Sequence, residues 1–304
     1  MRSFTTIGTL EQGESIRNVG QHARYFCVVG KSGFPHVGHV RATEFIRPMR
    51  GRSGPWLVRC DDGAHYVVKF PDNPQHVRIL ANEMLACRLA KLVGLPVAAS
   101  AFVEFIPGLA GPAPTPRSNV GARPEGGTAS LSFGSRFPGP PERTLVVDFL
   151  PDRLLSKVQN LVDIYVGGFA FDKWACNCDG RQVVFFRSAE DAGRPYTGLL
   201  IDQGFCFNGA AWNFPDSPIR SLCPWRLVYD TITSLESFEP FISRIESLGP
   251  ANLERCAADI PSEWRSPDPG ELIPLLSRLY ARGKKLRQLI LEAKTTSRFF
   301  RNWV

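Results

Sequence analysis

The sequence predicts an α+β protein with a bilobal arrangement, in which a small β-rich lobe is followed by a larger, mainly helical lobe. Three observations support this prediction. Short alternating apolar segments fill residues 41–70, apolar residues recur at spacings of three and four over 79–93, and the pattern from about 217 to 294 is mostly helical. We therefore divide the chain into a loosely attached, partly disordered leader (1–40), a first lobe (41–150) and a second lobe (151–304).

The first lobe is expected to contain a hairpin, a helix and further strands, in that order. FIRPM, WLVRC and HYVVKF have strand patterns, and the turn DDG joins the last two as a hairpin. The helix that follows ends at Gly94 and Pro96, and VAASAFVEFI is the next strand. Residues 107–143 are rich in Pro, Gly and Ser and are expected to form a long loop.

The second lobe is expected to begin where the strand TLVVDFLP (144–151) leaves the first. A helical pattern then covers residues 154–175, interrupted by Gly167 and Gly168, and it leads into the polar stretch CNCDGRQ. VVFFR and TGLLI are strands that come after this stretch, and a helical tail completes the lobe. The cleft of the molecule is expected between the two lobes.

The composition is that of a globular protein. The 304 residues are 43% hydrophobic and 21% charged, which excludes a disordered chain. No run of 18 apolar residues is present, and the N-terminal stretch lacks the apolar core of a signal peptide. The eight cysteines are scattered, often within apolar segments, as reduced core thiols would be. We expect a cytoplasmic protein with no membrane partner.

The charged residues limit the chemistry. All five histidines lie before residue 77, so a hydrolase with a histidine base in the second half of the chain is disfavoured. The net charge of +7 favours an anionic partner. The arginines are spread along the chain, with only short clusters such as RPMRGR, so the charge fits a phosphate-handling enzyme as well as a nucleic-acid-binding protein. Nothing beyond the net charge indicates nucleic acid.

Lys69 stands near the end of the apolar strand YVVKF, and Glu83 follows fourteen residues later in the predicted helix. A buried lysine is costly unless an anionic group meets it. Protein kinases pair a strand lysine with a helix glutamate to hold the phosphates of ATP. Taken alone, the pair is more often a lysine that reaches solvent at a strand edge and a solvated glutamate.

Two further segments have the composition of a nucleotide site. GRSGPWLV places Gly51, Ser53 and Gly54 in a turn whose backbone N–H groups are able to surround phosphate oxygens, although it matches no standard phosphate-loop pattern and a plain turn is the simpler interpretation. LLIDQGFCF ends a strand at Asp202, before Gln-Gly. This resembles the Asp-Phe-Gly segment of kinases, in which the aspartate binds Mg²⁺ and the glycine allows a sharp turn. An ordinary Asp-containing turn is the alternative.

The stretch FDKWACNCDGRQ contains the candidate catalytic acids. Kinases place the base aspartate five residues before a metal-binding asparagine, and Asp172 and Asn177 have this interval. Asp172 is expected on the helix, facing away from a cleft, whereas Asp179 lies in the loop and is better placed to meet a substrate hydroxyl. The residue five positions after Asp179 is Val184, which cannot bind a metal ion, and Gln182 is the nearest amide downstream.

These segments resemble the HipA-like kinases in their order along the chain and in their amino-acid sequences. The stretch DDGAHYVVKFPDNPQHVRILANEMLACRLAKLVGLPV is similar to the first lobe of that family, with its Y-V-V-K-F strand, N-P-Q turn and helix ending in L-G-L-P-V. FGSRF, VVDFLP, FDKWACNCD and LIDQG resemble further segments, so the similarity covers residues 41 to about 290. The resemblance implies an atypical Ser/Thr protein kinase-like fold and a phosphotransferase that uses ATP and Mg²⁺.

Carried over residue by residue, the resemblance implies roles for the nucleotide-binding groups. Lys69, paired with Glu83, would contact the ATP phosphates, and Asp202 would hold Mg²⁺. Gly51, Ser53 and Gly54 would form the phosphate loop.

The family's catalytic loop commonly resembles N-x-D-R-H-x-x-N, which this chain matches only in part. Asn177 and Asp179 match its first two marked positions, but Arg181 stands in place of the histidine and Val184 in place of the last asparagine. We expect Asp179, or else Asp172, to be the base. Arg181 would add a positive charge near the γ-phosphate. Either a second Mg²⁺ is lost, or Asn177 or Gln182 supplies the missing metal-binding oxygen.

Three function classes follow. The first is an ATP- and Mg²⁺-dependent kinase that phosphorylates a Ser or Thr of an unknown protein or of the chain itself. The second is a pseudokinase, or ATP-binding scaffold without transfer activity, which the departures in the catalytic loop favour. The third is a nucleic-acid-binding protein, which rests on net charge alone.

Overall fold

A computed structural model describes residues 38–105, 109, 131–191 and 193–304. Most of the predicted leader and much of the predicted 107–143 loop lie outside these residues. Helices and strands are mixed along the described chain, as the α+β prediction requires. The first strand begins at Gly38, so the last three residues of the predicted leader belong to a strand.

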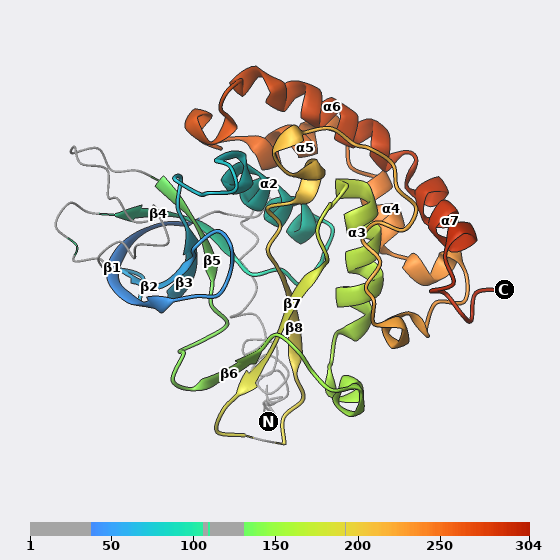
Figure 1. Cartoon of the computed structure of the whole chain (residues 1–304), viewed down its shortest axis with the longest axis horizontal. Helices are drawn as coiled ribbons and strands as arrows, with labels where there is room; N and C mark the ends of the chain where they lie inside the picture. Colours follow the sequence, from blue (N-terminus) through green and yellow to red (C-terminus); the bar gives the residue numbers. More distant parts are fainter. Residues whose placement is uncertain (1–37, 106–108, 110–130, 192) are drawn as a thin grey trace, which may run out of the picture.

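Five strands form a closed barrel in the order β1-β2-β3-β5-β4 (Figure 1). Neighbouring strands are antiparallel except β1 and β4, which are parallel. The expected turn DDG does join β2 to β3 in a hairpin. The strands are β1 (Gly38–Pro48), β2 (Trp56–Cys60), β3 (His65–Lys69), β4 (Ser100–Phe105) and β5 (Leu131–Arg136).

Strand β5 corrects the prediction of a loop over 107–143. It pairs with both β3 and β4, so the barrel does not close without it. Gly134 lies at its centre, where a Cβ atom would come within 2.6 Å of Val103 Cγ2 and 3.3 Å of Tyr66 Cδ1. The glycine therefore suits the close packing across the barrel. The local sequence does not predict this strand, because glycine has low strand propensity. Pairing with β3 and β4 in the barrel determines it.

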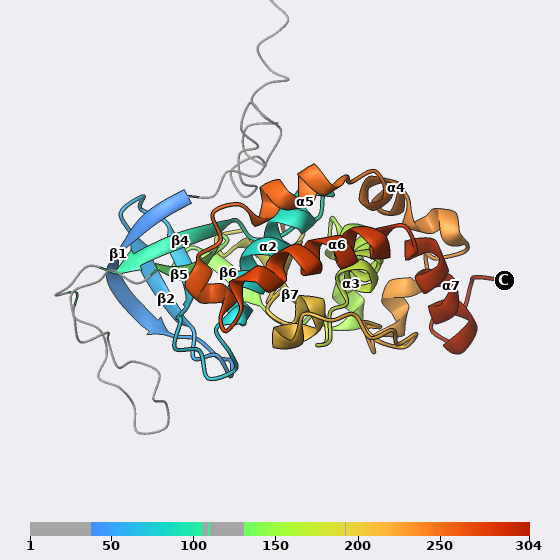
Figure 2. The same cartoon turned by 90° about the horizontal axis from the view of Figure 1, so that it is seen from above.

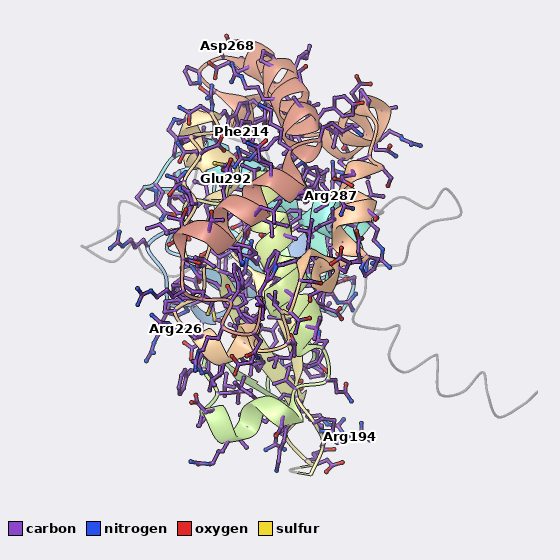
Figure 3. All side chains as sticks on the ribbon, turned by 90° about the vertical axis from the view of Figure 1, so that its right-hand side faces the viewer. Arg194, Phe214, Arg226, Asp268, Arg287 and Glu292 are labelled. Atoms are coloured by element: carbon purple, nitrogen blue, oxygen red, sulfur yellow. The ribbon has the colours of Figure 1, made fainter. Side chains whose placement is uncertain are left out.

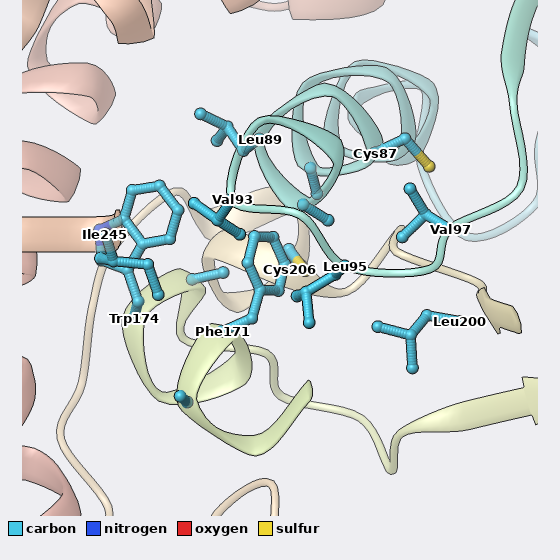
Figure 4. Close-up of a cluster of buried hydrophobic side chains, with 14 of the residues drawn as sticks. Cys87, Leu89, Val93, Leu95, Val97, Phe171, Trp174, Leu200, Cys206 and Ile245 are labelled. Carbon is cyan, nitrogen blue, oxygen red and sulfur yellow. The ribbon is translucent and has the colours of Figure 1, made fainter. Parts of the chain in front are cut away.

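Helix α2 (Arg78–Leu92) follows the barrel hairpin and is buried on all sides over Arg78–Ala90. A buried helix of this kind needs partners on several faces, and Figure 1 shows α2 between the barrel and the other helices. It packs on α3 (Gly168–Ala175) through the apolar cluster in Figure 4, where Leu89 and Val93 face Phe171 and Trp174. The helix predicted over 79–93 is therefore present.

Three antiparallel strands form a second sheet in the order β6-β7-β8, with bounds β6 (Thr144–Val147), β7 (Gln182–Ser188) and β8 (Thr197–Ile201). The helical pattern over 154–175 proves to be three pieces: a 3₁₀ turn (Asp152–Lys157), a π turn (Asp163–Gly167) and α3. At Gly167 a Cβ atom would lie 2.7 Å from atoms of Leu95 and Phe241, so close packing accounts for this glycine.

The remaining chain forms helices that cover α2 and α3, with α4 and α7 at the end of the molecule away from the barrel (Figure 2). Figure 3 views this side, with Arg287 and Glu292 on the last helix. None of the described helices is long and apolar enough to cross a membrane. The α-helices are α4 (Phe241–Glu246), α5 (Pro250–Ala257), α6 (Leu272–Gly283) and α7 (Leu286–Thr296), and the 3₁₀ turns are Cys206–Ala211, Arg226–Tyr229, Leu235–Phe238, Ser262–Arg265 and Pro269–Glu271.

Candidate functional site

A cavity of about 680 Å³ lies between the barrel and the segments that carry the predicted loop acids. Its barrel side consists of the turn before β2 together with residues of β3 and β5. Its other side includes, from the predicted catalytic loop and β7 and from the end of β8, the residues Cys178, Asp179, Gln182, Val184, Leu199, Ile201, Asp202 and Phe205. This volume falls in the range of small-molecule and cofactor sites. The cavity therefore brings together segments that are more than 100 residues apart in the sequence.

Lys69 is the buried charged group on the barrel side of the cavity. It ends β3 and is 8% exposed. Its Nζ donates hydrogen bonds to Glu83 Oε1 on α2 and to Asp202 Oδ1, the latter at 2.7 Å. Burial by itself lowers the pKa of Lys69, but the two carboxylates outweigh burial and raise it above the ordinary value. The ammonium is therefore charged at every physiological pH.

The two carboxylates that share this ammonium titrate differently. Burial raises the pKa of Glu83 despite the nearby Lys69 charge. Burial opposes ionisation of Asp202 as well, but the Lys69 ammonium and a hydrogen bond from Gln182 hold its pKa below the ordinary value. Asp202 is consequently an ionised carboxylate that lines the cavity.

The turn at Asp202 differs from the expectation. The sequence predicts a sharp bend at the glycine of Asp-Gln-Gly, but the left-handed residue is Asp202 itself, with φ of 56°. A Cβ atom at Gly204 would instead lie 2.5 Å from Ile79 Cγ2 and 3.3 Å from Glu83 Oε1. Glycine is therefore needed at position 204 because α2 approaches the backbone closely.

Asp179 is the exposed acid of the predicted catalytic loop, and it lines the cavity. Its backbone N–H donates to Asn177 Oδ1 at 3.1 Å. Asn177 is buried and its Nδ2 donates to Asp172 Oδ1 at 3.1 Å. The oxygen proposed for metal binding at Asn177 is thus engaged in shaping the loop, and Asn177 does not line the cavity.

Asp172 and Arg181 form a buried ion pair that is not part of the cavity lining. Arg181 Nε donates to Asp172 Oδ2 at 2.8 Å, and Nη2 bonds the other carboxylate oxygen. The Asp172 side chain is fully buried and that of Arg181 is 3% exposed. Asp172 faces away from the cavity, as expected. The expectation that Arg181 places a positive charge near a γ-phosphate is corrected, because its guanidinium is turned inward to neutralise Asp172.

Sequence reasoning missed Gln203, which is fully buried. Arg181 Nη1 donates to Gln203 Oε1 at 2.7 Å, and the Gln203 backbone N–H donates to Glu83 Oε2 at 2.9 Å. The residue stands where kinases have the phenylalanine of Asp-Phe-Gly, and this polar replacement was the available signal. It connects α2 to the Asp172–Arg181 pair.

The predicted phosphate loop lies in the turn between β1 and β2. Gly51 and Gly54 have φ of 140° and 59°, and the Gly54 N–H donates to Gly51 O at 3.3 Å. Gly51 and the buried Ser53 line the cavity, whereas Gly54 shapes the turn without lining it. Arg50 and Arg52 also line the cavity. They belong to the RPMRGR cluster, whose proximity to the site was not recognised from the sequence.

The donor set at Asp202 fits Mg²⁺. Among the described residues no group of three His, Cys, Asp or Glu side chains forms a metal centre, but Mg²⁺ usually binds through one or two carboxylates together with substrate phosphates and water. Asp202, Asp179 and the Gln182 amide line one cavity. Asp202 shares the Lys69 ammonium with Glu83, so its ionised carboxylate is only partly neutralised and favours an added cation.

The family comparison agrees with the geometry of the site. Residues 43–184 match the HipA-like kinase family. This confirms the resemblance predicted from the sequence over a segment that runs from the barrel to the catalytic loop, and it supports a kinase-like function. No curated protein matches the chain.

A kinase is among the solved structures that have a similar fold. The Helicobacter pylori proinflammatory kinase CtkA matches with a TM-score of 0.51 and 15% identity, over 85% of this chain and 99% of that chain. At this identity the likeness shows the fold alone, which is kinase-like. The Golgi casein kinase with Mn/ADP bound matches at 0.44 and 14% identity, over 86% of this chain and 74% of that one, and a second structure of that enzyme matches at 0.44 and 13%, over 94% and 78%.

Proposed function

We propose that this protein is an ATP- and Mg²⁺-dependent kinase of the HipA-like type, which transfers the γ-phosphate to a Ser or Thr hydroxyl. The observation that carries the proposal is the Lys69 ammonium, which bridges Glu83 and Asp202 inside a cavity that Asp179 also lines. The barrel and α2 act as the first lobe of a bilobal kinase and residues 151–304 as the second. The protein acts in the cytoplasm on a protein substrate.

The residues of the cavity have distinct roles in this proposal. Lys69 binds the α- and β-phosphates, and the backbone of the turn at Gly51 and Ser53 binds the remaining phosphate oxygens. Asp202 and Gln182 would hold Mg²⁺, which would neutralise charge on the phosphate oxygens. The substrate hydroxyl oxygen would attack the γ-phosphorus, and the bond from that phosphorus to the oxygen bridging to the β-phosphate would break, so that ADP leaves. The hydroxyl proton would pass to the Asp179 carboxylate. Phosphoryl transfer demands mainly positioning and charge neutralisation, which this set supplies.

The second candidate is an ATP-binding scaffold that transfers no phosphate. It is favoured by Val184, an apolar residue that lines the cavity where the family commonly has a metal-binding asparagine. A single Mg²⁺ on Asp202 leaves binding intact and weakens catalysis. The two candidates therefore share the nucleotide site and differ only in transfer.

Nucleotide titration with and without Mg²⁺ tests the shared site. We expect Lys69→Met to weaken ATP binding roughly 10- to 100-fold, because one charge-assisted hydrogen-bonding group is worth about 1.5–3 kcal/mol. Asp202→Asn should remove the Mg²⁺ dependence of ATP binding. Calorimetry and the ATP-induced melting shift of each variant, relative to its own unliganded form, provide the measurement.

The control is Lys285→Met, which removes an exposed lysine just before α7 and should leave binding unchanged. A Lys69→Met protein that shows the wild-type affinity and melting shift would eliminate the proposed nucleotide site.

A further inference from the structure

A continuous chain of buried polar groups connects the Lys69–Glu83 pair to the loop that carries Asp179. From Glu83 the contacts run to the backbone N–H of Gln203, from the Gln203 side chain to Arg181, and from Arg181 to Asp172. Asn177 bonds Asp172 and receives the Asp179 N–H. None of Gln203, Arg181, Asp172 and Asn177 lines the cavity.

From this connection we infer that Gln203, with the Arg181–Asp172 pair, is a positioning element that couples the placement of α2 to the placement of Asp179. The inference rests on the proposed function, because Asp179 is the group that meets the substrate. Gln203 is a positioning residue rather than a catalytic one, since it touches neither the cavity nor its contents.

The geometry permits such coupling because each group in this polar network has few alternative hydrogen-bond partners. Arg181 divides its donors between Asp172 and Gln203. Moving α2 outward would withdraw Glu83 Oε2 from the Gln203 N–H, and a buried donor left without a partner is costly. A shift of Gln203 would in turn expose Arg181 to the same cost. The placement of the loop acid therefore depends in part on the contact between Glu83 and the Gln203 N–H.

The alternative is that the chain merely stabilises the fold, as buried polar networks commonly do. The two possibilities differ in what they predict for catalysis. A stabilising network affects melting temperature and leaves kcat of the folded fraction unchanged. A positioning network lowers kcat while leaving the KM for ATP almost unchanged, because Asp179 acts in the transfer step and Lys69 acts in binding.

The test uses the full 304-residue chain with Mg²⁺ and ATP. It compares three variants that alter the polar network. Gln203→Met keeps the length of the side chain and removes its oxygen, whereas Gln203→Glu retains an acceptor for Arg181. The double variant D172L/R181M removes the ion pair in a charge-balanced way, so that no buried charge is left alone. Gln288→Met, at an exposed position on α7, is the matched surface control, and Ile290→Val is a control for lowered stability.

We expect Gln203→Met and the double variant to lower kcat for phosphate transfer roughly 100-fold, the effect of a misplaced reacting group, with KM for ATP changed less than about threefold. Gln203→Glu should recover most of the rate, and both controls should keep it. Hydrogen exchange of the Asp179 amide supplies a second readout: ATP with Mg²⁺ should slow it in the wild type and leave it unchanged in Gln203→Met.

The outcomes separate the two proposals. A wild-type protein that binds no ATP would overturn the proposed function and this inference with it. ATP binding with a wild-type kcat and Asp179 protection in Gln203→Met would overturn the positioning role alone. If the wild type binds ATP but shows no measurable transfer, hydrogen exchange of the Asp179 amide decides the question. Equal protection of that amide in the wild type and in Gln203→Met would contradict the positioning role.

Discussion

At the scale of single residues, Val184 decides between the two candidate functions. It lies five positions after Asp179 and lines the cavity beside Gln182. A valine side chain has no oxygen to offer a second metal ion, so catalysis would depend on Asp202 and its neighbours alone. The position is half-buried, and an asparagine there has the cavity in which to place its amide.

We predict that Val184→Asn raises phosphate transfer roughly tenfold or more if the protein is a weak kinase, because an added metal-binding oxygen stabilises charge in the transition state. Incorporation of labelled phosphate into the protein itself or into a generic substrate measures this. Val184→Thr, which has the valine shape without an amide, should remain at the wild-type rate. Unchanged transfer in Val184→Asn with ATP binding intact would favour the scaffold.

At the scale of elements, the Asn82 side chain joins α2 to the segment after Asp202 through several hydrogen bonds. Asn82 Nδ2 donates to the carbonyl oxygens of Gly204 at 2.7 Å and Gly209 at 3.0 Å, and Asn82 Oδ1 accepts from Trp212 Nε1 at 2.7 Å. All of these groups are buried. Glu83, the next residue, faces Lys69 and Gln203, so the same turn of α2 holds both the carboxylate and the segment that carries Asp202.

We predict that Asn82→Leu lowers the free energy of unfolding by about 2–3 kcal/mol, because the Trp212 N–H and the backbone carbonyls lose their buried partner. Urea unfolding, followed by tryptophan fluorescence, measures the change. Asn302→Leu is the matched control, since its amide bonds Asp230 O at the surface, and it should shift stability by no more than about 0.5 kcal/mol. Equal effects of the two substitutions would contradict a special role for Asn82.

At the scale of the whole molecule, the buried apolar residues form two clusters of unequal size. The barrel interior is a small cluster around Val58, Tyr66 and Val103. A much larger cluster extends from α2 through α3 to α7 and includes Phe102 and Phe133 from the barrel strands. Because local stability follows the amount of packed apolar surface, the barrel is the weaker part of the described structure. Lys69 lies on the weaker side of the cavity and Asp202 on the stronger.

We predict that amide hydrogens of β1 and β2 exchange faster than those of α3 in the protein without nucleotide, and that ATP with Mg²⁺ slows exchange in β3 by joining the two sides. Hydrogen exchange read by mass spectrometry measures both. If the amides of β1 and β2 exchange as slowly as those of α3, the two cores do not differ in stability as predicted. If ATP binds but the exchange rate of β3 amides does not change, ATP does not contact Lys69.

The sequence by itself determined the features that rest on local pattern. These are the hairpin of β2 and β3, the periodic helix α2 with its stop at Gly94, the position of Lys69 at a strand end, and the resemblance to the HipA-like kinases over residues that the family match confirms. Apolar spacing and turn residues determine local structure over a few positions, so such features can be predicted without knowledge of the fold.

Only the tertiary structure decided what depends on residues far apart in the chain. Strand β5 exists because β3 and β4 pair with it, against its own propensity. Arg181 turns inward because Asp172 is already buried there, and Gln203 meets Glu83 across 120 positions of sequence. Burial and partner geometry set the charge and direction of a polar side chain, and neither is encoded in its immediate neighbours.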